Sequence, residues 1–472
     1  MKNPVVIKIL VLCAITVLLM VGLGMVGGVV QERQRTRAQV SQSVADSLAG
    51  PQTLMGPLVY VACTESWNML TGKATSDEKI WVEHRREFMQ TAMPDSLTIQ
   101  AVAAMEPLAR GLHKVNAYNL KSRITAQWAS LASLKPVPTK SESRIQCGAP
   151  TLMLAVNDAR GIRTAQLTVA GKGVVLQPGT GHPSYLRGVH TRLAGSQQEL
   201  ATGLQTDWDV ELVGTEKLSF VPLGGTTDVQ LSSSWPHPSF GGRFLPAERS
   251  VTPEGFKAQW RLSALATTAG QDVAANKPAC IPATSPNADG NEMPAANDSC
   301  ADSFSVGFVE PVNLYSLSDR ATKYGVLFIA LTFLAVGMFE VMARLRVHPM
   351  QYLLVGCGIS IFFLLLVSLS EHLGFNAAYL VAATACVLLL GHYATSMLGS
   401  VLRGVPFGAG IALLYGLLFV LLQLEQTAMA VGAVALFAVL ALVMGLTRKL
   451  DWYALVGNAS AARAGNPPLT KT

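Results

Sequence analysis

Ionisable side chains inside apolar segments are the residues of this sequence best suited to chemistry. Such groups are costly at membrane depth and usually face the interior of a helix bundle or a water-filled path. They lie within, or at the ends of, the apolar stretches 324–341, 350–370 and 374–398. The candidate functional polar residues are Glu340, His348, Ser370, Glu371, His372 and His392.

These polar residues have a structural and a functional interpretation. Glu371 and His372 lie near one membrane interface, where reaching towards water or docking against a soluble domain explains them. Glu340 and His392 are either a structural pair or part of a proton or solute path. We favour structure, because transporters usually show broken helices or repeated halves, and a block of five spans does not divide that way.

The segment 235–242, Trp-Pro-His-Pro-Ser-Phe-Gly-Gly, is the most unusual stretch outside the apolar segments. Its prolines fix the backbone and its glycines permit positive φ, which is typical of a rigid crossing between sheets. The alternative is a loop that contacts a ligand or peptide through Trp235, His237 and Phe240.

Known catalytic and cofactor motifs are absent from the sequence. It has no H-E-x-x-H, C-x-x-C or G-x-S-x-G. The G-x-G-x-x-G at 22–27 lies in an apolar span rather than a βαβ unit, so it does not predict nucleotide binding. The net charge of +6 comes without a dense basic run, which argues against nucleic acid. We expect no enzyme activity, no metal and no cofactor.

The apolar segments predict a membrane protein. Charged residues make up only 14% of the chain, against about 25% in soluble domains, and they nearly vanish from 324 to 446. A span of about 20 apolar residues crosses a membrane, and the first lacks the short apolar region of a cleaved signal peptide. The six predicted spans are 9–30, 324–341, 350–370, 374–398, 405–424 and 427–446.

Basic residues predict the orientation of these spans. Arg344, Arg346, Arg403 and Arg448 follow the second, fourth and sixth spans, while the alternate loops carry no Lys or Arg. Positive loops stay in the cytoplasm, so both termini are expected there and the large domain is expected in the periplasm. Arginines at 33, 35 and 37 argue the other way, but three later loops agree with one another.

Cysteines in the intervening domain fit an oxidising compartment. Cys63, Cys147, Cys280 and Cys300 form an even set, which allows three pairings. Cys280 and Cys300 bracket a Pro-, Ala- and Asn-rich stretch, so Cys280–Cys300 is the preferred pair and Cys63–Cys147 the remainder. Four reduced thiols are the alternative.

The intervening domain reads as mainly β, with short apolar or alternating runs at 58–61, 97–102, 152–156 and 229–231. Ala126-Gln127-Trp128 recurs as 258–260, which predicts an internally duplicated, sandwich-like fold. The expected organisation is an anchor helix (1–30), a membrane-proximal stalk (31–50), a β domain (51–320, halves 51–150 and 151–320), a five-helix block (321–450) and a cytoplasmic tail (451–472).

Several segments in both parts resemble the CreD family of inner-membrane proteins. They are 324–333, 339–340, 348–356, 366–372, 376–379 and 447–453 in the apolar block, and 109–115, 158–162 and 235–240 in the β domain. The resemblance implies a role in cell-envelope integrity, colicin tolerance and an envelope-stress response. It implies no catalytic residue, and the stretch between Cys280 and Cys300 looks like a local insertion.

Two hypotheses follow. In the first, the chain is a non-enzymatic envelope-integrity factor whose β domain contacts an envelope component, either protein, peptidoglycan or lipid, while membrane lipids surround its helices. In the second, it is a transporter or lipid-handling enzyme that uses Glu340, Glu371, His372 and His392. The oligomeric state cannot be read from the sequence.

Overall fold

A computed structural model describes residues 4–71, 80–111, 113–193, 203–278, 300–308, 310, 314–342, 347–424 and 427–448. The chain divides into two compact units. The first contains residues up to Thr36 and from Val312 onwards, and the second runs from Arg37 to Pro311. Helix α1 (Pro4–Ser47) contributes to both, so the predicted stalk is largely a continuation of the anchor helix.

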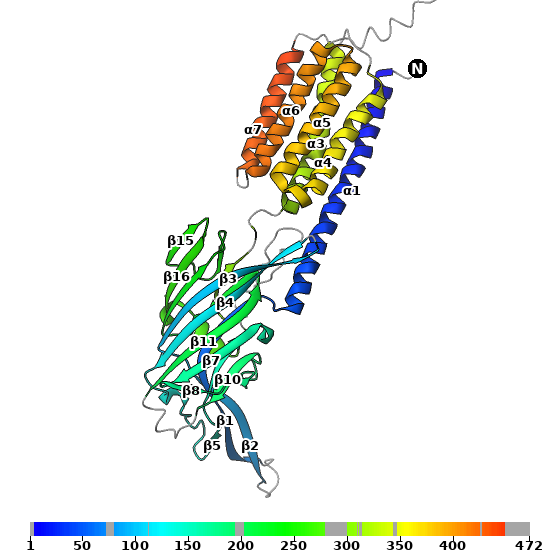
Figure 1. Cartoon of the computed structure of the whole chain (residues 1–472). Coiled ribbons are helices and arrows are strands. Elements are labelled where there is room, and N and C mark those ends of the chain that lie inside the picture. The colour runs from blue at the N-terminus through cyan, green and yellow to red at the C-terminus, as the bar shows by residue number, and fades with distance from the viewer. Residues whose placement is uncertain are drawn as a thin grey trace, which may run out of the picture. The chain divides into compact units, whose positions relative to one another are not determined.

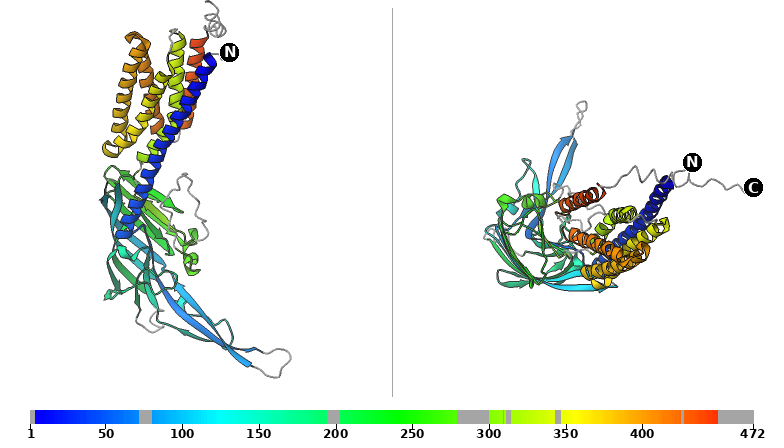
Figure 2. Two further views of the ribbon diagram at one scale, coloured as in Figure 1. Left: turned by 90° about the vertical axis from the view of Figure 1, so that its right-hand side faces the viewer. Right: turned by 90° about the horizontal axis from the view of Figure 1, so that it is seen from above.

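The helical unit contains the predicted apolar helices (Figures 1 and 2). Besides α1 they are α3 (Leu314–Met342), α4 (Pro349–Leu373), α5 (Phe375–Leu398), α6 (Val401–Gln423) and α7 (Ala428–Thr447). Among the described residues, five helices are long and apolar enough to cross a membrane, and α7 adds the shorter apolar stretch Ala430–Gly445. The multi-pass architecture is therefore confirmed.

Aromatic side chains hold the helices of this unit together. Phe362 of α4 contacts the rings of Tyr379 on α5 and Tyr415 on α6, with centroids 5.4 and 4.5 Å apart. Helix α1 packs through Leu19 and Leu23, both nearly fully buried. The glycines of its G-x-G-x-x-G segment mostly face open space, so leucines rather than glycines bring α1 against its neighbours.

The second unit is mainly β, as expected, and contains two sheets (Figure 1). The nine-stranded sheet A has the order β14-β17-β12-β1-β6-β10-β9, with β2 and β5 also paired to β1. Its strands are β1 (Gln52–Thr71), β2 (Ile80–Ala92), β5 (Arg144–Cys147), β6 (Thr151–Val156), β9 (Gln177–Pro178), β10 (Gly188–Arg192), β12 (Lys217–Val221), β14 (Ser239–Gly242) and β17 (Phe304–Gly307).

The eight-stranded sheet B has the order β15-β16-β13-β3-β4-β11-β7-β8. Its strands are β3 (Ser96–Arg110), β4 (His113–Trp128), β7 (Ile162–Val169), β8 (Lys172–Val174), β11 (Leu204–Thr215), β13 (Thr226–Ser233), β15 (Glu248–Thr252) and β16 (Gly255–Ser263). A short helix, α2 (Ala269–Ala274), follows β16. The paired ends of β1 and β2 extend beyond the rest of the unit as a long hairpin (Figure 2).

One apolar core joins the two sheets. Trp260 of sheet B stacks on Phe304 of sheet A with ring centroids 4.9 Å apart, and Phe304 in turn stacks on Phe220. All three are fully buried, as residues on the inner faces of a β sandwich are. The predicted sandwich is therefore confirmed.

The predicted halves, 51–150 and 151–320, do not fold as separate subdomains. Residues before 150 supply β1, β2 and β5 to sheet A, and β3 and β4 to sheet B. Leu97 and Val229, which are related by the same sequence offset as the repeated Ala-Gln-Trp segments, lie on adjacent parallel strands and are both buried. The halves are interleaved because β3 and β13 pair directly in the middle of sheet B.

A disulfide joins Cys63 of β1 to Cys147 of β5, 84 residues apart in sequence. The two residues face each other in the antiparallel β1–β5 pairing. This confirms the predicted Cys63–Cys147 pair, which was expected because Cys280 was assigned to Cys300. Cys300 is also disulfide-bonded, while its expected partner Cys280 lies outside the described residues.

A buried carboxylate anchors the loop beside this disulfide. Glu65 of β1 accepts hydrogen bonds from the Ser143 hydroxyl (2.6 Å) and from the backbone N–H and hydroxyl of Thr139 (both 2.7 Å). These bonds lower the pKa of Glu65 to about 2, so the carboxylate stays ionised at neutral pH. The glutamate is a structural anchor that the sequence patterns did not indicate.

Candidate functional site

Sheet B presents a polar face on the side opposite the core. Side chains alternate along β3, so Leu97, Ile99 and Ala101 are buried while Gln100 and Val102 are exposed. The same period of two places every second residue of the neighbouring strands on the outer face. Because the strands pair in register, these outward side chains line up across the sheet.

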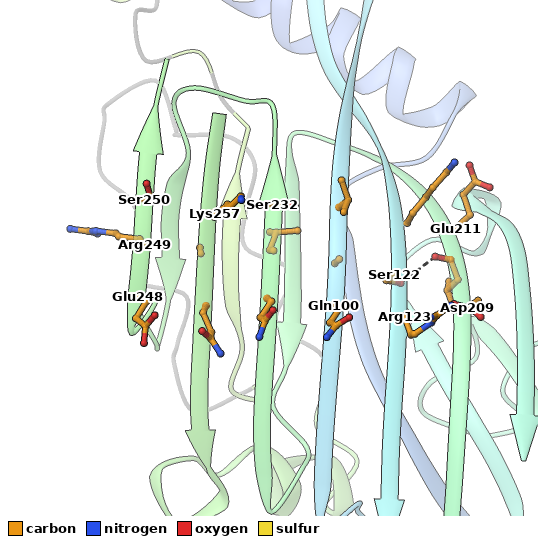
Figure 3. A pocket seen from close by; sticks show the side chains of 18 of the residues that line it. Gln100, Ser122, Arg123, Asp209, Glu211, Ser232, Glu248, Arg249, Ser250 and Lys257 are labelled. Atoms are coloured by element: carbon orange, nitrogen blue, oxygen red, sulfur yellow. Dashed lines mark hydrogen bonds and ion pairs between the residues drawn. The ribbon is translucent and has the colours of Figure 1, made fainter. Parts of the chain in front are cut away.

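Two parallel rows of side chains result, each crossing seven strands (Figure 3). The register places Gln230 beside Gln100, Arg123 beside Gln100, and Asp209 beside Arg123. From β15 to β7, the first row is Glu248, Gln259, Gln230, Gln100, Arg123, Asp209 and Gln166. The second row is Ser250, Lys257, Ser232, Val102, Lys121, Glu211 and Thr164.

These rows line a hollow of about 1130 Å³, here called the sheet B hollow. Most of its lining residues are polar, and none is aromatic or methionine. The two rows hold three basic residues (Lys121, Arg123, Lys257) and three acidic ones (Asp209, Glu211, Glu248), and Arg249 also lines the hollow, which leaves one excess positive charge. The hollow is therefore a nearly neutral, hydrogen-bonding surface.

Ion pairs and hydrogen bonds fix the flanks of the hollow. On one side the Arg123 Nε lies 3.0 Å from a carboxylate oxygen of Asp209, and the Asn119 amide donates to Glu211 at 2.7 Å. On the other side the Gln259 amide donates to Asp228 at 2.8 Å. These contacts hold part of the polar side chains on each flank in place.

The centre of the hollow holds two side-chain amides, Gln100 and Gln230. Gln100 and Gln230 are exposed, and neither side-chain amide hydrogen-bonds to another residue in the part of the chain that the structure describes. Val102, 56% exposed, lies beside them. Two adjacent amides are thereby free to donate and accept hydrogen bonds from a ligand.

The predicted residue Glu340 lies at the end of α3 in an ion pair with Lys8 of α1. The Tyr352 hydroxyl of α4 donates to the same carboxylate at 2.9 Å, and the Lys8 ammonium also donates to the Val347 carbonyl at 3.1 Å. Three helices thus meet at one carboxylate. His392 is exposed on α5, and its predicted pairing with Glu340 is replaced by Lys8.

His348 and Ser370 serve the ends of α4. The Nδ1 of His348 accepts from the Met350 N–H at 3.2 Å, while Gln351 accepts from the His348 N–H at 3.0 Å, which makes a capping box. Ser370 is buried, and its hydroxyl donates to the Val367 carbonyl at 2.8 Å. These contacts stabilise the two ends of α4, so both side chains have a structural role.

Glu371 and His372 separate at the other end of α4. Arg33 of α1 lies 3.4 Å from a carboxylate oxygen of Glu371, whose side chain is 11% exposed, whereas His372 is exposed. The structure therefore does not bring the six membrane candidates into one site. It uses both glutamates to join α1 to the other helices.

The loop of Trp235, His237 and Phe240 packs mainly against the core. The indole N–H of Trp235 donates to the His237 carbonyl at 2.8 Å, and Phe240 contacts the rings of Phe256 and Trp260 at 5.7 and 5.8 Å. Only His237 of the three is exposed. This geometry fits the rigid-crossing interpretation.

The sheet B hollow is the feature that the sequence patterns missed. The runs 97–102 and 229–231 predicted two of its strands, and their outward residues Gln100 and Gln230 were readable as polar positions. Their adjacency depends on the parallel β3–β13 pairing, which no local pattern reports. Among the described residues, no group of three or more His, Cys, Asp or Glu side chains could hold a metal ion.

Two comparisons with known proteins identify the same family. A family model described as inner membrane protein CreD matches residues 4–453. The inner membrane protein CreD of Escherichia coli (strain K12) is 33% identical over 455 residues, which are 96% of this chain and 95% of that protein. The similarity therefore includes both the helical unit and the β sandwich.

Proposed function

We propose, from the premise that the chain belongs to the CreD family of inner membrane proteins, that it is a non-enzymatic envelope-integrity factor. Its helices hold the β sandwich outside the cytoplasm, where the sheet B hollow contacts an envelope component. The observation that carries this proposal is the nearly neutral, polar hollow across seven strands, with two amides at its centre that are unpaired among the described residues. Exposed side-chain amides can recognise a ligand because they both donate and accept hydrogen bonds.

The Cys63–Cys147 disulfide supports the proposed side of the membrane. Structural disulfides persist in oxidising compartments such as the periplasm and are rare in the cytosol. The basic loops of the helical unit point the same way. Both termini are then cytoplasmic, and the chain contributes to envelope-stress or colicin tolerance through the periplasmic contact.

The interactions of Glu340 and Glu371 favour this role over transport. Each carboxylate is held in an ion pair with a basic residue of α1. A proton or solute path needs groups that change partners, and the contacts described here are those of helix packing. The proposed role of both glutamates is therefore to position α1.

Photo-crosslinking in cells tests the contact. A photoreactive residue in place of Gln230, at the centre of the hollow, is expected to give covalent products with an envelope component. The matched control is Gln127, which is exposed on the same face of sheet B but outside the hollow. The proposal fails if positions 230 and 127 give the same products, or if position 230 reaches only cytoplasmic proteins.

A further inference from the structure

The chemistry of the sheet B hollow selects one class of ligand. Protein interfaces are enriched in aromatic residues and methionine, and the lining has neither. A lipid chain needs an apolar groove, whereas the rows are polar. An anionic polymer needs a large excess of basic residues, whereas the lining holds four basic and three acidic side chains, an excess of one. An uncharged, hydroxyl-rich polymer remains.

The spacing of the rows indicates how such a polymer would lie. Neighbouring strands are about 4.8 Å apart, so a row that crosses seven strands presents a polar side chain at each step over roughly 29 Å. Each sugar of an extended β-1,4-linked glycan advances the chain by a length close to this spacing, and successive sugars turn their acetamido groups to opposite edges. The two rows, roughly 7 Å apart along the strands, match the two edges of a flat glycan ribbon.

The central amides provide the recognition step. A primary amide can donate through its N–H groups and accept through its oxygen at the same time. Gln100 and Gln230 are side by side on β3 and β13 and are left unpaired among the described residues, so both can bind an acetamido group or a pair of hydroxyls. The exposed methyl groups of Val102 offer a small apolar contact to a sugar ring.

We infer that the sheet B hollow binds an extended, N-acetylated glycan strand running perpendicular to the strands of the sheet. This inference rests on the proposed function, because it names the chemical class of the envelope component at the same face. Since the hollow is open and lacks aromatic stacking, single sugars bind weakly. Affinity comes from many repeats along one polymer.

The test uses the full chain purified in detergent and three insoluble polymers. The protein is expected to sediment with cell-wall sacculi stripped of attached proteins and with chitin, but not with cellulose, which lacks acetamido groups. The double variant Gln100→Ala/Gln230→Ala removes the two central amides and is expected to weaken binding about tenfold. Gln127→Ala, outside the hollow, is expected to bind like the wild type.

A competition experiment keeps the test independent of the variants. Soluble chito-oligosaccharides are expected to release the wild-type protein from sacculi, and cello-oligosaccharides are not. The inference is overturned if the wild type binds neither sacculi nor chitin, or if the double variant and Gln127→Ala bind equally. Cross-links from position 230 to a protein without glycan binding would overturn the glycan inference and leave the proposed contact face standing.

Discussion

Replacing Glu340 by lysine is expected to deplete the folded protein from the membrane. Lys8 would then face a second ammonium where it now pairs with a carboxylate, and the Tyr352 hydroxyl would lose its acceptor. Removing one partner of a buried pair costs about 3–5 kcal/mol. The side chains here are 30% and 17% exposed, so we expect about 2–3 kcal/mol from loss of the pair alone.

A charge-swapped double variant distinguishes loss of this ion pair from nonspecific destabilisation of the protein. Lys8→Glu combined with Glu340→Lys restores opposite charges and is expected to recover much of the lost stability, measured as the melting temperature of the full chain in detergent. Asp319→Lys is the control, because its partner Lys323 has a side chain that is 75% exposed, and exposed pairs contribute little. If the swap is as unstable as either single variant, the pairing does not position α1.

Loss of the Cys63–Cys147 disulfide is expected to destabilise the β sandwich strongly. The bond closes a loop of 84 residues between β1 and β5, and removing a native disulfide typically costs about 2–5 kcal/mol. The measurement is thermal unfolding of the Cys63→Ser/Cys147→Ser variant in the full chain.

The matched control for this variant is Cys357→Ser, because Cys357 is an unpaired thiol in α4. It should leave unfolding of the sandwich unchanged. Replacing both cysteines is more specific than adding a reductant, because a reductant would also break the disulfide of Cys300. An unchanged unfolding temperature in the double variant would contradict the structural role assigned to the bond.

Patterns that are local in sequence predicted the helical unit well. The third predicted span, 350–370, corresponds to α4 (Pro349–Leu373), and the fourth, 374–398, to α5 (Phe375–Leu398). A long apolar run permits few structures in lipid, because every backbone polar group must be satisfied internally. The sequence patterns divided α1 into an anchor and a stalk, although the helix continues to Ser47. The reason is that the hydropathy changes at residue 31 while the helical backbone continues without a break.

Contacts between distant residues could not be predicted in the same way. Glu340 was identified as a candidate, but its partner Lys8 lies 332 positions away, and no spacing rule links them. The sequence allowed three ways to pair the four cysteines, and only the β1–β5 register shows that Cys63 lies opposite Cys147. The sheet B hollow has the same origin, because its rows exist only once seven strands are aligned.

The measurement that tests the account most directly is complementation of a strain lacking this gene, scored as survival under envelope stress. Val102→Trp fills the centre of the hollow from a side chain that is 56% exposed, so the core is left intact. At equal membrane abundance, we expect Val102→Trp to fail to restore tolerance while Gln127→Trp, outside the hollow, restores it fully. Full tolerance with Val102→Trp would contradict the claim that this face performs the function.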